Sequence, residues 1–331
     1  MSKNINKLNP IMLKKVFDNK VIGQDIAKKQ ICMAIDGQIK KYEDPNYQKT
    51  KKNLFLIGKR GSGKSEIIKT LKENISLPVV ILDAYSLLKS ENMLEDITKE
   101  VFMESNLDLD LAKHAIVVIE NLDTALTANP ERYFVDKEGM EFINDLEALL
   151  NAEIEINLGK DESKEATDEN NEDEIFSMED MMFIVTAALP EIEIMVKRRI
   201  GSNKIGFLRG TNVSDLYSVI QTSDFIDLGL PTSFIGAFDS LIKFRNRSKK
   251  EVMDVIAKSD LITNYTEKLK EMGKDLIIKN EAIEELATYS MEQELGLWSL
   301  KNMIESKMTI VEFDSLINKD KEIVIKTFLD V

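Results

Sequence analysis

The sequence is short of the side chains that build most metal and hydrolase sites. Its 331 residues include one cysteine, Cys32, and one histidine, His114. A single thiol excludes an internal disulfide framework and zinc sites built from several thiolates. A single imidazole leaves little for a histidine-based metal centre or a Ser-His triad. We therefore expect neither a zinc enzyme nor a serine hydrolase.

Long apolar runs are also missing. No stretch approaches the roughly 20 consecutive apolar residues that a membrane span needs, and the first residues lack the apolar core of a signal peptide. Acidic residues outnumber basic ones by 58 to 44, and the formal net charge of −14 disfavours nonspecific binding to nucleic acid or anionic lipid. The sequence thus predicts a cytoplasmic protein with no nucleic-acid and no membrane partner.

The acidic charge is concentrated in one segment. Residues 160–180 hold ten acids and two lysines, so this stretch carries −8 of the net charge of −14. A segment with few β-branched and aromatic residues cannot bury enough apolar surface to order itself. We expect a solvated loop here, and a docking arm is the alternative.

Apolar runs that alternate with helical patterns predict an α/β fold. Four runs are typical of strands buried on both faces of a parallel sheet, at residues 53–57, 79–83, 115–120 and 182–186, and a fifth candidate lies at 240–244. The crossovers that a parallel sheet requires are predicted as helices at residues 24–41, 64–74, 94–104 and 141–151.

The pattern changes after residue 244. Helical patterns then dominate, at residues 249–257, 266–272, 281–291 and 300–312, with strand-like runs at 275–279 and 322–328. The sequence therefore predicts a large α/β domain over residues 1–244. A small, mostly helical α+β domain is predicted over residues 245–331.

A glycine-rich loop follows the first predicted strand. It fits the pattern G-x-x-x-x-G-K-[ST] with a strand before it and a helix after it. Glycines let successive N–H groups and the helix N-terminus point at phosphate oxygens, the lysine neutralises phosphate charge, and the final hydroxyl can ligate Mg²⁺. The loop predicts a P-loop NTPase fold and nucleotide binding by Gly58, Lys59, Arg60, Gly61, Ser62, Gly63, Lys64 and Ser65.

The strand predicted at residues 115–120 ends in a second candidate. A P-loop enzyme needs an acid on a neighbouring strand to hold the metal, and a group that orients or deprotonates water. Glu120 could reach the Mg²⁺ shell together with Ser65. Asn121, the next residue, is neutral and cannot accept a proton from water.

Several motifs in order resemble the AAA+ ATPase core of the ClpX family, the unfoldase partners of the ClpP protease. The similar segments are VIGQ at 21–24, the glycine-rich loop, IVVIENLD at 116–123, FIVTAAL at 183–189, DLGLPTSFIG at 227–236 and ELGLWSLKNMIE at 294–305. The resemblance implies an AAA+ fold, ATP or ADP with Mg²⁺, a hexameric ring, and an adenine contact from Val21 and Ile22. Thr186, in its sensor-1 strand, either contacts phosphate or water or is structural. The family's N-terminal zinc-binding domain has no counterpart in this sequence.

Other positions depart from the family. The resemblance places Asn121 at the catalytic glutamate, Ala237 at the arginine finger and Trp298 at the sensor-2 arginine. The aromatic pore loop reads ENML at 91–94, and the acidic stretch stands where the family has a basic loop. An indole cannot neutralise phosphate, so Trp298 either closes the cleft between domains by apolar contact or is plain core.

One family tripeptide is retained. Ile205, Gly206 and Phe207 match the loop by which this family docks into apolar clefts on ClpP. An exposed Ile–Phe pair on a glycine-bearing loop resembles an anchor for a pocket. The alternative is ordinary packing of Phe207 beneath a loop.

The departures bear on hydrolysis more than on binding. Losing a catalytic base lowers a rate by about 10²–10⁴, and losing an arginine finger by about 10³–10⁵. We therefore predict a degenerate ClpX-like protein that binds ATP or ADP and serves as a regulatory or interaction subunit, joining a ring of ClpX-like subunits or capping a ClpP-like peptidase. One alternative is an active unfoldase whose water is oriented by Glu120 or Asp123. The other is an adaptor that binds no nucleotide.

Overall fold

The chain divides into two compact units in a computed structural model. The structure describes residues 9–44, 46–47, 52–126, 137–151, 155–157, 175–202, 215–293, 296–318 and 320–329. Unit 1 comprises Met1–Lys20, Asp25–Gly58 and Lys64–Phe244, and unit 2 comprises Val21–Gln24, Lys59–Gly63 and Arg245–Val331. Two short segments from early in the chain therefore belong with the C-terminal region.

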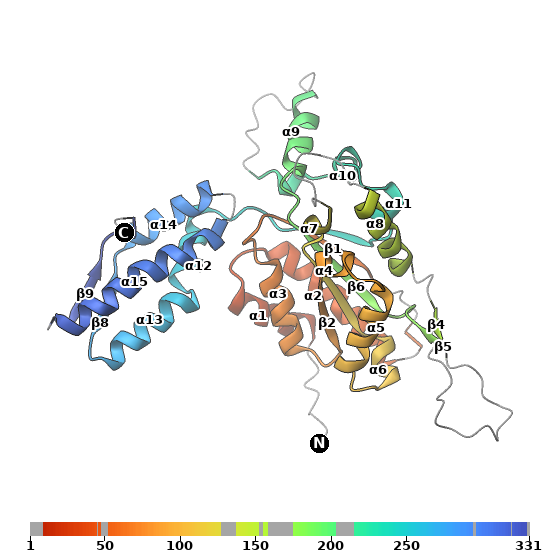
Figure 1. Cartoon of the computed structure of the whole chain (residues 1–331), viewed down its shortest axis with the longest axis horizontal. Coiled ribbons are helices and arrows are strands. Elements are labelled where there is room, and N and C mark those ends of the chain that lie inside the picture. Colours follow the sequence, from red (N-terminus) through yellow and green to blue (C-terminus); the bar gives the residue numbers. More distant parts are fainter. Residues whose placement is uncertain are drawn as a thin grey trace. The chain divides into compact units, whose positions relative to one another are not determined.

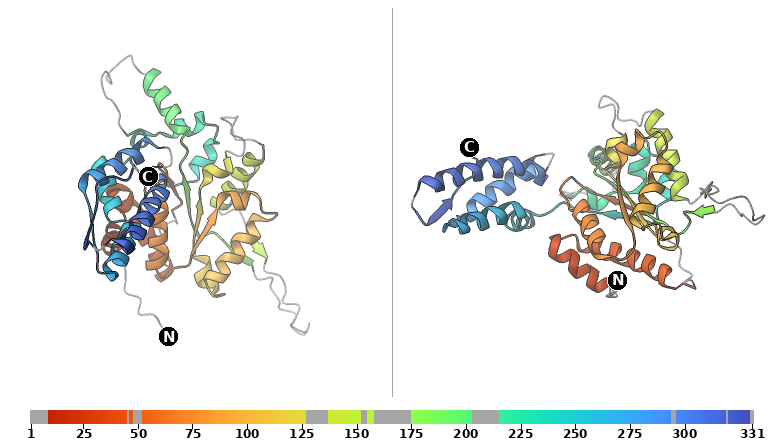
Figure 2. Two further views of the ribbon diagram at one scale, coloured as in Figure 1. Left: turned by 60° about the vertical axis from the view of Figure 1, so that its left-hand side comes forward. Right: turned by 60° about the horizontal axis from the view of Figure 1, so that its bottom comes forward.

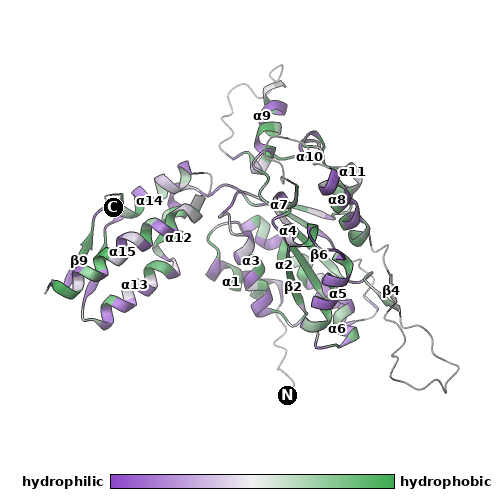
Figure 3. Cartoon of the chain, in the orientation of Figure 1, coloured by the Kyte–Doolittle hydropathy of each residue, from purple (hydrophilic) through white to green (hydrophobic). Residues whose placement is uncertain are grey.

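Unit 1 is built on a five-stranded parallel sheet in the order β2-β3-β6-β1-β7 (Figure 1). The strands are β1 (Leu54–Ile57), β2 (Val79–Asp83), β3 (Ile116–Glu120), β6 (Met182–Ala187) and β7 (Ser240–Lys243). Every residue of β1 and β6 is buried, which explains why their sequences are apolar apart from Thr186 (Figure 3). The predicted α/β class with a parallel sheet is confirmed.

Helices cover both faces of this sheet (Figure 2). Across the sheet, the connection from β1 to β2 runs in one direction and the connection from β2 to β3 runs in the other. Because such crossovers are right-handed, they place α3 and α5 on opposite faces of the sheet. The helices before β3 are α1 (Pro10–Lys20), α2 (Asp25–Glu43), α3 (Lys64–Asn74), α4 (Ala84–Leu88), α5 (Met93–Glu104) and α6 (Leu109–Lys113). Those after it are α7 (Leu122–Leu126), α8 (Lys137–Leu150), α9 (Ile192–Ser202), η1 (Tyr217–Val219), α10 (Thr222–Asp227) and α11 (Thr232–Gly236).

The end of the acidic segment is folded, so the expectation of a solvated loop up to residue 180 is wrong there. β5 (Ile175–Ser177) pairs antiparallel with β4 (Glu155–Asn157). Phe176 is 1% exposed and contacts the ring of Phe102 edge-on, with centroids 4.8 Å apart, and Met178 is fully buried. Phe176 and Met178 are apolar, so burying their side chains favours this folded end of the segment. Residues 160–174 lie outside the described part of the chain.

Unit 2 has its own apolar core. Its helices are α12 (Lys249–Ala257), α13 (Asp260–Glu271), α14 (Asn280–Glu292), η2 (Gly296–Ser299) and α15 (Leu300–Ile317). Two strands, β8 (Asp275–Ile278) and β9 (Glu322–Ile325), pair in parallel. Leu269, Leu286, Met308 and Phe328 are fully buried in this core. Ser248 and Glu251 form a reciprocal capping box that starts α12.

The lone cysteine has a structural role. Cys32 is 2% exposed on α2, as its apolar neighbours predict. Burial raises the pKa of its thiol to about 12, so the thiol stays protonated at neutral pH and is a poor nucleophile. Among the helices in the described part of the chain, none combines the length and apolar composition needed to cross a bilayer.

Candidate nucleotide-binding site

The glycine-rich loop joins β1 to α3 as the sequence predicts. β1 ends at Ile57 and α3 begins at Lys64. Gly61 and Gly63 have φ values of +76° and +105°, a conformation that other residues rarely adopt. The strand, the tight loop and the helix thus give the backbone the curl that a phosphate cradle needs. We call residues 59–63, which belong to unit 2, the crest of the loop.

Lysine and hydroxyl groups of this loop differ in their surroundings. The Lys64 Nζ donates a hydrogen bond to the carbonyl oxygen of Gly58, where the loop begins. Ser65, Lys59 and Arg60 are exposed. Ser62 is 6% exposed, and its Oγ is buried without a hydrogen-bond partner among the described residues. An unsatisfied buried hydroxyl costs about 1–3 kcal/mol, so such an atom in a binding loop indicates a ligand that completes it.

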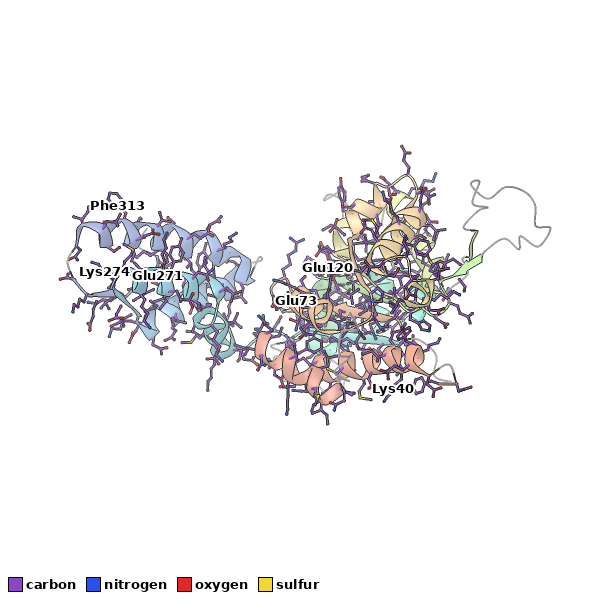
Figure 4. All side chains as sticks on the ribbon, turned by 90° about the horizontal axis from the view of Figure 1, so that it is seen from below. Lys40, Glu73, Glu120, Glu271, Lys274 and Phe313 are labelled. Carbon is purple, nitrogen blue, oxygen red and sulfur yellow. The ribbon has the colours of Figure 1, made fainter. Side chains whose placement is uncertain are left out.

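Glu120 ends β3 at the carboxyl edge of the sheet (Figure 4). Parallel strands end at one edge, and open α/β sheets bind ligands there. The Glu120 Oε1 is buried and has no hydrogen-bond partner in the part of the chain that the structure describes. An oxygen in this state fits a hard cation such as Mg²⁺, which takes one or two protein oxygens and completes its shell with phosphate and water.

Asn121 is exposed and is held by two hydrogen bonds. Its backbone N–H donates to the Thr186 Oγ1 at 3.2 Å, and its Nδ2 donates to the Asp83 Oδ2 at 3.2 Å. Its φ is +60°, which asparagine tolerates better than most residues. Thr186 is 1% exposed near the end of β6, in the strand that the resemblance assigns to sensor 1.

Asp123 is also engaged inside unit 1. It is 4% exposed, and its Oδ1 accepts a hydrogen bond from the Ala188 N–H at 2.9 Å. A carboxylate that fixes the chain at the end of β6 is poorly placed to orient water. This geometry disfavours the alternative in which Asp123 replaces the missing base.

The other substituted positions fall in different parts of the structure. Ala237 follows α11, and its N–H donates to the Ser233 carbonyl at 2.9 Å. Trp298 lies on η2, but its side chain is outside the described part of the structure. The tripeptide of Ile205, Gly206 and Phe207 lies outside the described residues as well. Its docking role stays a prediction.

Gln24 ties the crest to the start of the C-terminal region. Its Nε2 donates to the carbonyls of Ser62, at 3.3 Å, and Arg245, at 2.8 Å, while its Oε1 accepts from the Arg245 N–H at 3.1 Å. Gln24 is 3% exposed. These three bonds satisfy the buried amide and fix the crest. In the sequence, Gln24 stood out only as part of the VIGQ segment, and that segment did not predict which residues Gln24 contacts.

Close packing surrounds the two crest glycines. A Cβ on Gly63 would lie 2.9 Å from the Val21 Cγ1, and a Cβ on Gly61 would lie 3.3 Å from the backbone N of Leu297. Val21 is 2% exposed, and Ile22 is half-buried. The predicted adenine-side segment and η2 therefore both lie against the crest.

An ion pair supports the same region. The Arg245 guanidinium binds both oxygens of Glu251, and this hydrogen bonding holds the pKa of that carboxyl at about 2 despite its partial burial. A Cβ on Gly23 would lie 2.5 Å from the Glu251 Oε1, so only glycine leaves room for the pair. Neither Arg245 nor Glu251 stood out in the sequence, because charged residues are common there.

Known proteins similar to this chain agree with the geometry. Residues 54–192, which hold β1, the loop, β2, β3 and β6, match the model of the "ATPase family associated with various cellular activities (AAA)". The chain is 25% identical to the "ATP-dependent Clp protease ATP-binding subunit ClpX" of Treponema denticola, over 96% of this chain and 80% of that protein. It is 24% identical to the ClpX of Borrelia duttonii, over 96% and 77%. Residues 54–192 therefore resemble the AAA ATPase family, and nearly the whole chain is distantly similar to ClpX.

Proposed function

We propose that this chain binds ATP or ADP with Mg²⁺ at residues 58–65 and hydrolyses ATP too slowly to drive protein unfolding. Resemblance to the AAA family implies nucleotide binding. One observation carries the site assignment: the glycine-rich loop is complete, and a buried Ser62 hydroxyl on it lacks a partner among the described residues. A ligand with phosphate oxygens satisfies such a group.

The residues present have distinct roles in this proposal. Backbone N–H groups of the loop and the N-terminus of α3 hold phosphate oxygens, and Lys64 neutralises their charge. Ser65 and Glu120 hold the metal, which supplies charge neutralisation at the phosphates when bound. Val21 and Ile22 contact the adenine side of the nucleotide.

Slow turnover follows from three side chains. Asn121 cannot act as a base and is bonded to Asp83. Ala237 cannot act as an arginine finger, and Trp298 brings no charge to the phosphates. A common turnover of about 10 s⁻¹ should then fall below about 10⁻³ s⁻¹, even with strong non-additivity.

The experiment compares binding with turnover on the full chain. Calorimetry should detect ATP and ADP binding, while phosphate release stays near background. A turnover of about 1 s⁻¹ or faster would contradict the proposal. That result would favour an active unfoldase in which Glu120, whose Oε1 has no partner among the described residues, orients the water.

For its cellular role, we propose a regulatory or interaction subunit of a Clp-type assembly in the cytoplasm. The similar proteins carry the name of a Clp protease subunit, which supports a ring of six ClpX-like subunits or a complex with a ClpP-like peptidase. Burying the side chains of Ile205 and Phe207 contributes at most about 3–6 kcal/mol before association costs, so one loop binds weakly and a ring binds through several.

Co-sedimentation with a ClpP-like peptidase tests the partner. Binding should require assembly in ATP and should disappear in Phe207→Ala. Equal binding of the variant and the parent would show that residues 205–207 are not the anchor.

A further inference from the structure

Arg247 lies against the crest of the loop. Its Nη1 donates to the carbonyl oxygen of Gly61, and its Nε donates to the Ile22 carbonyl at 3.5 Å. Its Nη2 lies 2.8 Å from the position that a Cβ on Gly63 would occupy. All four residues belong to unit 2. A guanidinium from the C-terminal region therefore stands among the predicted phosphate- and adenine-binding segments.

This guanidinium has no hydrogen-bonded anion among the described residues, although the Glu251 carboxylate acts on it through space. Across the ranges that the structure describes, Arg247 forms no ion pair and no hydrogen bond with a carboxylate. The nearest candidate, Glu251, has both of its oxygens bound by Arg245. A guanidinium has five N–H donors, and among the described residues two of those of Arg247 have an acceptor.

Burial makes the missing anion costly. Removal from water is the main cause that lowers the pKa of Arg247 below its usual range. The Glu251 carboxylate offsets part of this effect, and the Arg245 charge lowers the pKa further. Arg247 is half-buried, and a cation partly withdrawn from water is stabilised when it is paired or when another charge reaches it. The two carbonyl contacts orient the side chain but do not neutralise it.

We propose that Arg247 is a phosphate ligand of the bound nucleotide, an inference that rests on the proposed nucleotide site. Phosphate would supply the missing counter-charge, and the planar fork of arginine matches phosphate oxygens in pairs. The donors of Nη2 have no acceptor among the residues that the structure describes, and Nη2 lies beside Gly63. Arg247 thereby provides positive charge that Trp298 cannot provide from η2.

If Arg247 is not a phosphate ligand, its removal should change nucleotide affinity or stability in a different direction. If the guanidinium only occupied space at the crest, nucleotide would have to displace it, and removing it would tighten binding. If it served only to hold the crest together, removing it would lower the stability of the ligand-free protein. The two carbonyl contacts alone allow either case, so the direction of the change in affinity decides.

The test compares Arg247→Leu and Arg247→Lys with Lys249→Leu as a control. Lys249 is two residues away, half-exposed and paired with Glu284, so this control removes the same charge. Calorimetry with the full chain should show ATP binding weakened about 10- to 100-fold in Arg247→Leu, and less in Arg247→Lys. The control should stay within about twofold, as expected of an exposed ion pair. Inorganic triphosphate has no nucleobase. Used as a competitor, it should lose affinity for Arg247→Leu by the same factor as ATP.

Ligand-free stability separates binding from structure. The melting temperature of ligand-free Arg247→Leu should equal or exceed that of the parent, because a half-buried charge without an ion-pair partner among the described residues is gone. Unchanged or tighter ATP binding in Arg247→Leu would overturn the inference and leave the proposed function standing. A lower ligand-free melting temperature would also overturn it, in favour of a structural role. If the parent itself binds no ATP, the proposed function fails and the inference fails with it.

Discussion

Two loops leave the same edge of the sheet in unit 1, and they differ in what chemistry they retain. The loop after β1 begins at Gly58 and ends in Lys64, whose Nζ is bonded back to Gly58. The loop after β3 carries Asn121, whose amide is bonded to Asp83. A protein can keep the groups that bind phosphate and lack those that activate water, because binding depends on backbone N–H groups and one cation. Hydrolysis needs, in addition, a base at one position.

The largest effect is expected from breaking the retained loop. Lys64→Ala removes the cation proposed to neutralise the phosphates and should weaken ATP and ADP binding about 100-fold or more. Titration calorimetry measures this directly. Lys69→Ala, an exposed lysine on the same helix, is the matched control and should bind like the parent. Binding by Lys64→Ala with unchanged affinity would place the nucleotide elsewhere.

A second change tests the backbone of the crest. Gly63→Ala puts a Cβ 2.8 Å from the Arg247 Nη2 at a φ of +105°, so the loop must shift or strain. We expect ATP affinity to fall about 10- to 100-fold. Gly37→Ala is the control, because nothing lies within 4 Å of its Cβ and a helical glycine is replaced. That variant should bind normally and gain about 0.5–1 kcal/mol of stability.

The loop after β3 can be tested by introducing an acidic side chain at residue 121. Asn121→Glu places a carboxylate beside Asp83 and puts a glutamate at a φ of +60°. Like charges and the left-handed backbone should lower the free energy of unfolding by about 2 kcal/mol, measured by urea denaturation. Adding Asp83→Asn should recover about half of the loss, because asparagine still caps α4. No loss in the single variant would show that Asn121 and Asp83 do not interact in solution.

The smallest effect concerns the ion pair that supports the crest. The pKa of Glu251 is about 2 in the folded protein against an ordinary value of 4.5, so the unfolded chain takes up the proton first. The stability from Arg245–Glu251 is therefore fully present above about pH 4.5 and is lost as the pH falls toward 2. Arg245 is 43% exposed, which screens the pair and limits it to about 1 kcal/mol.

Glu251→Gln isolates this contribution. The difference in unfolding free energy between the parent and the variant should be constant from pH 5 to 7 and should shrink below about pH 4.5. Glu284→Gln, which breaks the exposed pair with Lys249, should show almost no difference at any of these pH values. A difference for Glu251→Gln that grows on acidification would contradict the assignment.

Local patterns predicted much of the fold. The bounds of α3 and α12 agree with the helices predicted at residues 64–74 and 249–257, because their apolar spacing and caps are local. The helix predicted at 266–272 begins earlier, at Asp260. Ser259 accepts a hydrogen bond from the Ile262 N–H there, a capping signal that apolar spacing alone does not reveal. α1 had no predicted counterpart at all.

The sequence by itself determined the chemistry that each position can offer: a complete phosphate loop, an amide at residue 121, and no guanidinium at residues 237 and 298. Side-chain identity and short-range spacing are properties of the chain, so they need no structure. Only the tertiary structure decided which groups meet. Gln24 bonds Arg245 across 221 residues, and Arg247 reaches Ile22 across 225. Such contacts depend on how distant segments pack, and no local pattern in the chain encodes them.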